Sequence, residues 1–172
     1  MKTITVRLDP KSVKNAIDAL NEYRADVERK SRLLVERLTD YGADIARVKI
    51  VGLRAIDTGE LLGGVDGYYS PSLNVGYVKV TSDHVAFVEF GTGIVGKASP
   101  HRNDEYLSKA SWTYASGKKI FTTRNGRVGW IYPTDDGGYR FTEGMVSRPF
   151  MYETALELQR EFPRIAKEVF ST

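Results

Sequence analysis

Hydrophobic residues recur at alternating spacings of four and three along the first part of the chain. Asp9 suits a helix N-cap, Pro10 suits the first helical position, and no further Pro or Gly occurs before Gly42. This pattern predicts a long helix from Pro10, which Gly42 either kinks or ends, with a continuation over Ala43–Val51 left open. The seam consists of Val13, Ile17, Leu20, Arg24, Val27, Ser31, Leu34, Leu38, Tyr41 and Ile45.

A helix of thirty-odd residues is about 50 Å long, which exceeds the width of a domain of this size. We therefore expect part of the helix to project from the domain. A narrow apolar seam of this period is typical of a helix that lies along a partner. Two partners stay open at this point: a neighbouring chain, or the sheet of the same chain.

A turn and a hairpin are predicted after this helix. The segment 57–64 predicts a sharp corner, because Asp57 and Glu60 have a capping-box-like spacing and Gly59 permits a positive φ. The segments 75–81 and 84–90 both alternate side chains between two faces, which predicts two strands. The short link Ser82-Asp83 would join these strands as a hairpin.

An insertion with a small sheet of its own is predicted over residues 96–144. Asn125-Gly126 between two strand-like runs is a strong hairpin signal, and the turn at 135–138 leads to a third run. A three-stranded meander is expected here, with Trp130 and Tyr132 in a core. The last element is a helix, which we expect Ser147 to cap and Pro163 to kink or restart.

Together these elements predict a single α+β domain over residues 1–172. It would have a long N-terminal helix, an antiparallel sheet of about four strands, the inserted meander and a C-terminal helix packed on the sheet. The chain has no Cys, which excludes disulfides, Cys-ligated metals and thiol catalysis. No apolar run reaches the length of a membrane-spanning helix or a signal peptide, so we expect a cytoplasmic chain without a membrane partner.

The charge is mildly basic, with a formal net charge of +3. Between Lys97 and Arg140 there are eight Lys and Arg residues against four Asp and Glu residues, so the surplus falls in the predicted insertion. Cations interleaved with aromatic residues on a small sheet could stack bases and neutralise phosphates. Nucleic-acid binding through this segment is therefore an alternative function, against the interpretation that its aromatic residues are core and its cations solvated.

Little in the sequence points to catalysis, a cofactor or a metal. Of the two histidines, His84 and Asp83 would point to opposite faces of a strand, and His101 is expected in a solvated loop. Glu89 stands out because it lies in an otherwise apolar run before Gly91. A buried carboxylate needs partners, so we expect it to accept hydrogen bonds from amides of residues 91–93 or to pair with Arg148. A catalytic Glu89 would lack a second titratable group.

Three segments in a fixed order resemble the tail-component family of long-tailed, lambdoid-type bacteriophages and prophages. The first follows a helix, the second ends the predicted hairpin and the third opens the C-terminal helix. The resemblance covers about residues 13–169, with a long insertion, and departs from the family at Ala55-Ile56, where many members have Pro. The residues that carry it are Asp57, Thr58, Gly59, Glu60 and Leu61; Val88, Glu89, Phe90, Gly91, Thr92 and Gly93; and Arg148, Pro149, Phe150, Met151 and Ala155.

The resemblance implies a structural virion protein for head–tail joining or tail completion, with no enzyme activity and no cofactor. Its partners would be copies of itself in a ring, expected to be a hexamer, together with connector or head-closure proteins and tail-terminator or tail-tube proteins. Contact with genomic DNA would be weak at most. The protein would be assembled in the bacterial cytoplasm and reside in the neck of the virion, and the three segments would be architectural.

The residues alone leave two further classes of protein open. A small hydrolase would need a pocket that brings Glu89, His84 or His101 within about 3 Å of a second titratable group. A toxin or stress protein would use the long helix for dimerisation.

Overall fold

The structure is a computed structural model that describes residues 5–55, 59–115, 117–134 and 136–171. Its first element is the 43-residue helix α1 (Pro10–Gly52), which confirms the predicted long helix and its continuation past Gly42. The side chain of Asp9 caps α1 by accepting a 2.9 Å hydrogen bond from the amide of Ser12. Gly42 does not end α1, because it lies inside the helix.

Gly42 allows α1 to approach two other elements closely. A Cβ at this position would lie 2.8 Å from Cγ2 of Val78 and 2.9 Å from Cδ1 of Leu158. A side chain at this position would therefore have to displace the methyl groups of Val78 and Leu158.

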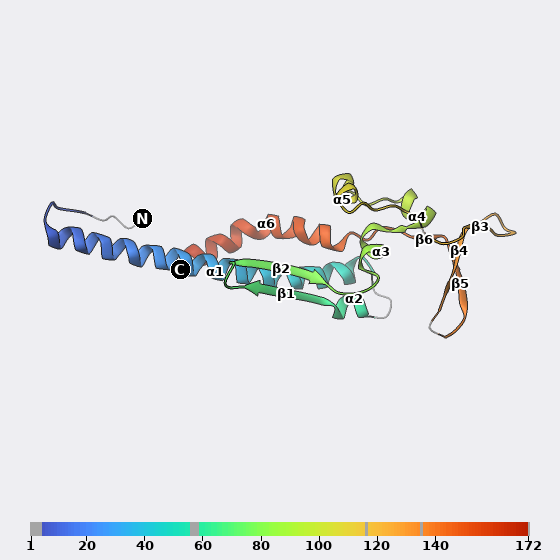
Figure 1. Cartoon of the computed structure of the whole chain (residues 1–172), viewed down its shortest axis with the longest axis horizontal. Coiled ribbons are helices and arrows are strands. Elements are labelled where there is room, and N and C mark those ends of the chain that lie inside the picture. Colours follow the sequence, from blue (N-terminus) through green and yellow to red (C-terminus); the bar gives the residue numbers. More distant parts are fainter. Residues whose placement is uncertain (1–4, 56–58, 116, 135, 172) are drawn as a thin grey trace.

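A two-stranded antiparallel hairpin, β1 (Val65–Ser70) and β2 (Val75–Val80), packs on α1 (Figure 1). The strand predicted over 75–81 is thus present, but its partner is β1. The predicted second strand is wrong, because residues 85–90 form the short helix α3 (Val85–Phe90). The sheet therefore has two strands where about four were expected.

Three short helices complete the connections. Helix α2 (Glu60–Gly63) precedes β1, and Gly59 before it has a φ of 85°, as the predicted corner requires. Helices α4 (Gly93–Ala98) and α5 (Asp104–Lys109) follow α3. Asp57 and Thr58 lie outside the described residues, so the capping exchange proposed between Asp57 and Glu60 stays a prediction.

The predicted meander is confirmed as the antiparallel strands β3 (Phe121–Thr122), β4 (Val128–Pro133) and β5 (Tyr139–Thr142). Within the sheet Phe121 pairs with Gly129, and Tyr132 pairs with Arg140. A further short segment, β6 (Gly144–Met145), bridges to Thr92 and Gly93 beside α4. Figure 1 shows the meander at the opposite end of the molecule from the start of α1.

The chain closes with α6 (Phe150–Ser171), which lies along α1 and contains Pro163 without an assigned break (Figure 1). The core lies where the ends of these elements meet, with Phe150 and Ile50 completely buried. Its buried members are Ala43, Ala46, Ile50, Ala55, Leu61, Val65, Val88 and Phe150. The α+β class with long N- and C-terminal helices and antiparallel strands is confirmed. Among the described helices, none is both long and apolar enough to span a bilayer.

Candidate functional site

The segment 88–93 runs from the end of α3 into the start of α4, with two backbone positions that favour glycine. Gly91 has a φ of 78° and Gly93 a φ of 64°. A Cβ on Gly93 would lie 2.5 Å from the carbonyl oxygen of Glu143 and 2.7 Å from the ring of Trp130. The segment is thus held tightly against the chain that leads into α6.

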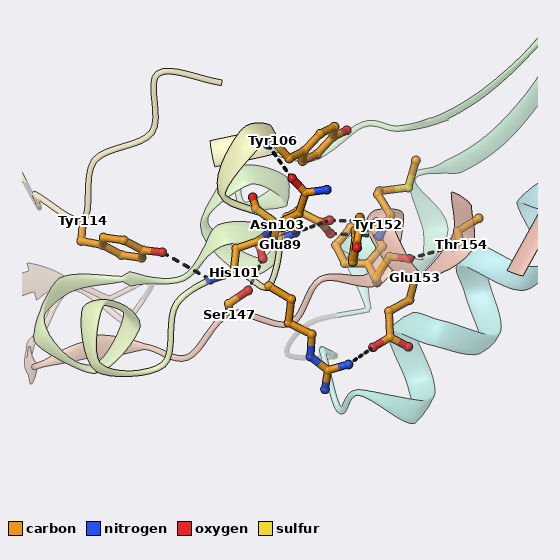
Figure 2. Close-up of polar contacts among 12 residues, drawn as sticks. Glu89, His101, Asn103, Tyr106, Tyr114, Ser147, Tyr152, Glu153 and Thr154 are labelled. Atoms are coloured by element: carbon orange, nitrogen blue, oxygen red, sulfur yellow. Dashed lines mark hydrogen bonds and ion pairs between the residues drawn. The ribbon is translucent and has the colours of Figure 1, made fainter. Parts of the chain in front are cut away.

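Glu89 caps the N-terminus of α6. Its Oε2 accepts a hydrogen bond from the amide of Met151 and its Oε1 one from the amide of Tyr152, each 2.9 Å long (Figure 2). The first amides of a helix have no partners within the helix, and the positive end of the helix dipole favours a carboxylate. A side chain 62 residues earlier in the sequence therefore fixes where α6 begins.

The partners that we expected for Glu89 are wrong, although its burial and its need for hydrogen bonds are confirmed. Among the described residues, its carboxylate accepts no hydrogen bond from an amide of residues 91–93 and forms no ion pair with Arg148. Instead, the backbone amide of Arg148 donates to the carbonyl of Val88 over 2.8 Å. Ser147 does not cap α6 with its side chain, since its Oγ donates to the carbonyl oxygen of Glu89.

His101 is the residue that the sequence interpretation placed wrongly. It is 2% exposed, and its Nε2 lies 3.5 Å from Oε1 of Glu89. The amide of Asn103 donates to Nδ1 over 3.1 Å, and the carbonyl oxygen of Asn103 also lies 3.3 Å from Nδ1. No protein atom in the described residues completes a hydrogen bond with Nε2, so its attraction to Glu89 is electrostatic.

Aromatic rings enclose His101 on several sides. The ring centroids of Phe90, Tyr106 and Tyr152 lie 5.4, 5.8 and 5.2 Å from that of His101. The hydroxyl of Tyr114 accepts a 3.3 Å hydrogen bond from the backbone amide of His101 (Figure 2). Side chains from α3, α5 and α6 therefore converge on one buried imidazole, which no local sequence pattern predicts.

Burial is the main influence on the acidity of Glu89. Removal of water raises the pKa of its carboxyl group above the ordinary value of 4.5. The hydrogen bonds from Met151 and Tyr152, followed by the interaction with His101, act in the opposite direction and offset part of this effect. The pKa of Glu89 is raised overall, because the effect of burial is larger than that of the hydrogen bonds from the helix amides.

His101 is a second titratable group beside Glu89, which the sequence analysis did not find. However, the side chains of His101 and Glu89 are 0% and 4% exposed, so a substrate could not reach them in this conformation. Within the described residues, no cluster of three or more His, Asp or Glu side chains could hold a metal ion. The geometry fits a structural clasp that joins three segments.

One hollow shares Tyr114 with the surroundings of His101. It has a volume of about 430 Å³ and is lined by Gly93, Tyr114, Ile120 and Trp130, with Lys97 at its side. Among the described residues that line it, Lys97 and the hydroxyl of Tyr114 are the ionisable groups, and none is a carboxylate or an imidazole suited to acid–base work.

The structure brings two of the three family-like segments together. Segment 88–93 contacts segment 148–151 through Glu89 and Val88, whereas Leu61 of the first segment reaches the same core as Val88 and Phe150. Ala155 lies further along α6 and is exposed. A scan of protein-family models and searches of curated proteins and solved structures found no match to this chain.

Proposed function

We propose that this chain is a structural virion protein that acts in head–tail joining or tail completion of a long-tailed bacteriophage. In this proposal it assembles as a ring of copies at the neck and makes no catalytic contribution. Its partners are connector or head-closure proteins on one side and tail-terminator or tail-tube proteins on the other.

The observation that carries the proposal is the cap that Glu89 provides to α6. The two segments that the resemblance singled out, 88–93 and 148–151, are joined by this carboxylate and by the bond between Arg148 and Val88. A motif that serves architecture should place its side chains in packing and capping contacts, as Glu89 and Phe150 are placed. A motif that serves catalysis should instead present a reachable group, and Glu89 is 3% exposed.

The exposed apolar side chains of α1 also support a role in assembly. Ile17 and Leu20 are 52% and 56% exposed in the isolated chain, at the end of the molecule that projects beyond α6 (Figure 1). Structural subunits need surfaces of this kind for their neighbours.

The test is deletion of the gene from a phage or prophage that carries it. We expect separate heads and tails in micrographs and a loss of infectious particles, both restored by the wild-type gene supplied in trans. A Glu105→Ala gene is a matched control and should also restore joining, since the Glu105 side chain is exposed and pairs with Lys109, not with Glu89 or His101. Normal yields of joined, infectious virions after deletion would overturn the proposal.

A second candidate is nucleic-acid binding through the meander. Trp130 is half-buried, but Tyr132 and Tyr139 are 38% and 76% exposed, and Arg140 lies beside Tyr132 in the sheet. Tyr132 is therefore not a core residue, contrary to the expectation. Affinity for DNA that falls steeply between about 50 and 200 mM salt, and is weakened by Arg140→Ala but not by Arg29→Ala, would favour this function. No binding at low salt would exclude it.

A further inference from the structure

Residues 99–113 form a surface segment with a single buried anchor, and we call this segment the flap. It leads from α4 towards β3 and contains α5, which has no buried residue. The structure describes every residue of the flap, and His101 is the one among them that is buried. Figure 1 shows α5 on the outside of the molecule. The deepest contact between the flap and the rest of the chain is therefore made by one imidazole.

Two contacts nearer the surface also hold the flap. Nε1 of Trp112 donates a 3.1 Å hydrogen bond to the carbonyl oxygen of Gly91, and Arg102 lies 3.4 Å from Glu153 of α6. Trp112 is half-buried, and the side chain of Arg102 is 75% exposed. None of the described flap residues belongs to the core around Phe150. Segments with few buried apolar contacts can open locally, without unfolding of the whole chain.

The anchor of the flap faces a second ionisable group inside the protein. Nε2 of His101 lies 3.5 Å from Oε1 of Glu89, and the two side chains are 0% and 4% exposed (Figure 2). Nε2 has no hydrogen-bond partner among the described residues, whereas the carboxylate accepts the amides of Met151 and Tyr152. A carboxyl group on the body and an imidazole on the flap are thus placed to share a proton.

The neighbouring elements contribute further ionisable groups. Three are phenols and three form an ion-pair group: Tyr106, Tyr114 and Tyr152, and Arg102, Lys49 and Glu153. Glu153 lies 3.6 Å from Lys49 as well as 3.4 Å from Arg102. Between about pH 4 and 8, the side chains that titrate are normally carboxyl and imidazole groups. The titration of Glu89 and His101 must therefore be distinguished from that of Glu153.

One shared proton makes the closed pair electrically neutral. Loss of this proton leaves a buried carboxylate beside a neutral ring, where little water can hydrate it. Opening of the flap would admit water to both groups. Met151 and Tyr152 could keep their hydrogen bonds to Glu89, because α3 and α6 lie outside the flap. The deprotonated pair therefore favours the open flap, and the neutral pair favours the closed one.

We propose that Glu89 and His101 form a pH-sensitive latch, which holds the flap closed while the pair retains a shared proton and releases the flap as the pH rises. Burial raises the pKa of the Glu89 carboxyl group in the closed state above the ordinary value of 4.5. The stabilisation of the closed flap is thus complete below about pH 4.5 and is lost as the pH passes through the higher pKa of the closed state. The latch goes beyond the proposed function and does not depend on it.

Amide hydrogen exchange of the full chain, corrected for the intrinsic effect of pH on exchange, tests the latch. The amides of Leu107 and Trp112 report on the flap, because each donates a hydrogen bond within it. The amide of Ile50 reports on α1. We expect the protection of the flap amides to fall several-fold between about pH 5 and 7, and to stay below that of Ile50 at both pH values.

Two variants remove one titrating group each. Glu89→Gln and His101→Phe should both abolish the pH dependence of flap protection. His101→Phe keeps an aromatic ring as the anchor, so it remains informative if Glu89→Gln does not fold. Glu153→Gln is the matched control, because it removes the carboxylate that pairs with Arg102 of the flap and should leave the pH dependence in place. Circular dichroism checks that each variant is folded.

Several results would overturn the latch. One is flap protection in the wild type that is equal at the two pH values or rises with pH. Another is a pH dependence that survives in the folded variants of Glu89 and His101, or that Glu153→Gln abolishes. Protection of Leu107 and Trp112 as high as that of Ile50 would show that the flap opens only with the whole fold, which would also overturn the proposal.

Discussion

Oε1 of Glu89 lies 3.5 Å from Nε2 of His101, and both side chains are almost completely buried. The same carboxylate accepts hydrogen bonds from the amides of Met151 and Tyr152 at the start of α6. Glu89 therefore connects α3, the loop after α4 and the C-terminal helix. The loss of Glu89 would therefore affect three segments at once.

Replacement of Glu89 by Ala should destabilise the fold. The amides of Met151 and Tyr152 would lose their acceptor, and hydrogen bonds to a charged group contribute about 1.5 to 3 kcal/mol each before the cost of carboxylate burial is subtracted. We expect a net loss of about 2 to 4 kcal/mol, measured by denaturant unfolding.

Glu105→Ala is the control for this experiment. Glu105 and Lys109 form an exposed pair on α5, with side chains 75% and 72% exposed, and exposed pairs contribute about 0 to 1 kcal/mol. Equal stabilities of Glu89→Ala and Glu105→Ala would show that the cap on α6 contributes nothing.

The contribution of Glu89 to stability should fall as the pH rises. Burial raises the pKa of its carboxyl group in the folded chain above the unfolded value near 4.5, so the folded state holds this proton more tightly. Stability from this source is complete below the unfolded pKa and is lost as the pH passes through the folded pKa. The melting temperature of the wild type minus that of Glu89→Gln should thus decrease above about pH 4.5. An increase with pH would contradict the direction of the shift.

Gly93→Ala should cost more than an alanine at an unobstructed glycine with a similar φ. Its new methyl group would collide with the carbonyl of Glu143 and the ring of Trp130. We expect a loss of about 2 to 4 kcal/mol from strain and displacement together. At Gly126 the φ is 79° but nothing lies within 4 Å of the added Cβ, so Gly126→Ala should cost only about 1 to 2 kcal/mol. Similar losses in the two variants would show that the contact around Gly93 is not tight.

Pro163→Ala should stabilise α6. Pro163 lies inside the helix, where it supplies no amide hydrogen and is about 3 kcal/mol less favourable than Ala. We expect a gain of about 1 to 3 kcal/mol in thermal unfolding. Pro10→Ala is the control, because Pro10 is the first residue of α1 and its missing amide hydrogen has no role there. No gain from Pro163→Ala would mean that the helix is already adapted to proline.

The long elements could be predicted from the sequence because their signals are local. Asp9 and Pro10 mark the start of α1, and Asn125-Gly126 marks the turn between β3 and β4. The helix α3 could not be distinguished from a strand. Five of its six residues are apolar, Glu89 being the exception, and a run this short has the same pattern in either conformation. Strand β1 was missed because Asp66 and Gly67 are unfavourable in strands, although Gly67 lies against Thr39 and Ala43 of α1.

The candidate site was only half predictable. Glu89 stood out as a lone carboxylate in an apolar run, and that signal correctly indicated a buried group with hydrogen-bond partners. The identity of those partners depended on where α6 begins relative to α3, which no spacing in the sequence encodes. His101 gave no signal, because its burial arises from rings on α3, α5 and α6 that meet only in the folded chain.

The missing side chain at Gly42 has a consequence for the surface of the molecule. The two residues that a methyl group there would strike, Val78 and Leu158, also line a hollow of about 360 Å³ between α1, β2 and α6. The shape of that hollow therefore depends on a residue that does not itself line it. An alanine at this position would displace both of these side chains and so change the shape of the hollow.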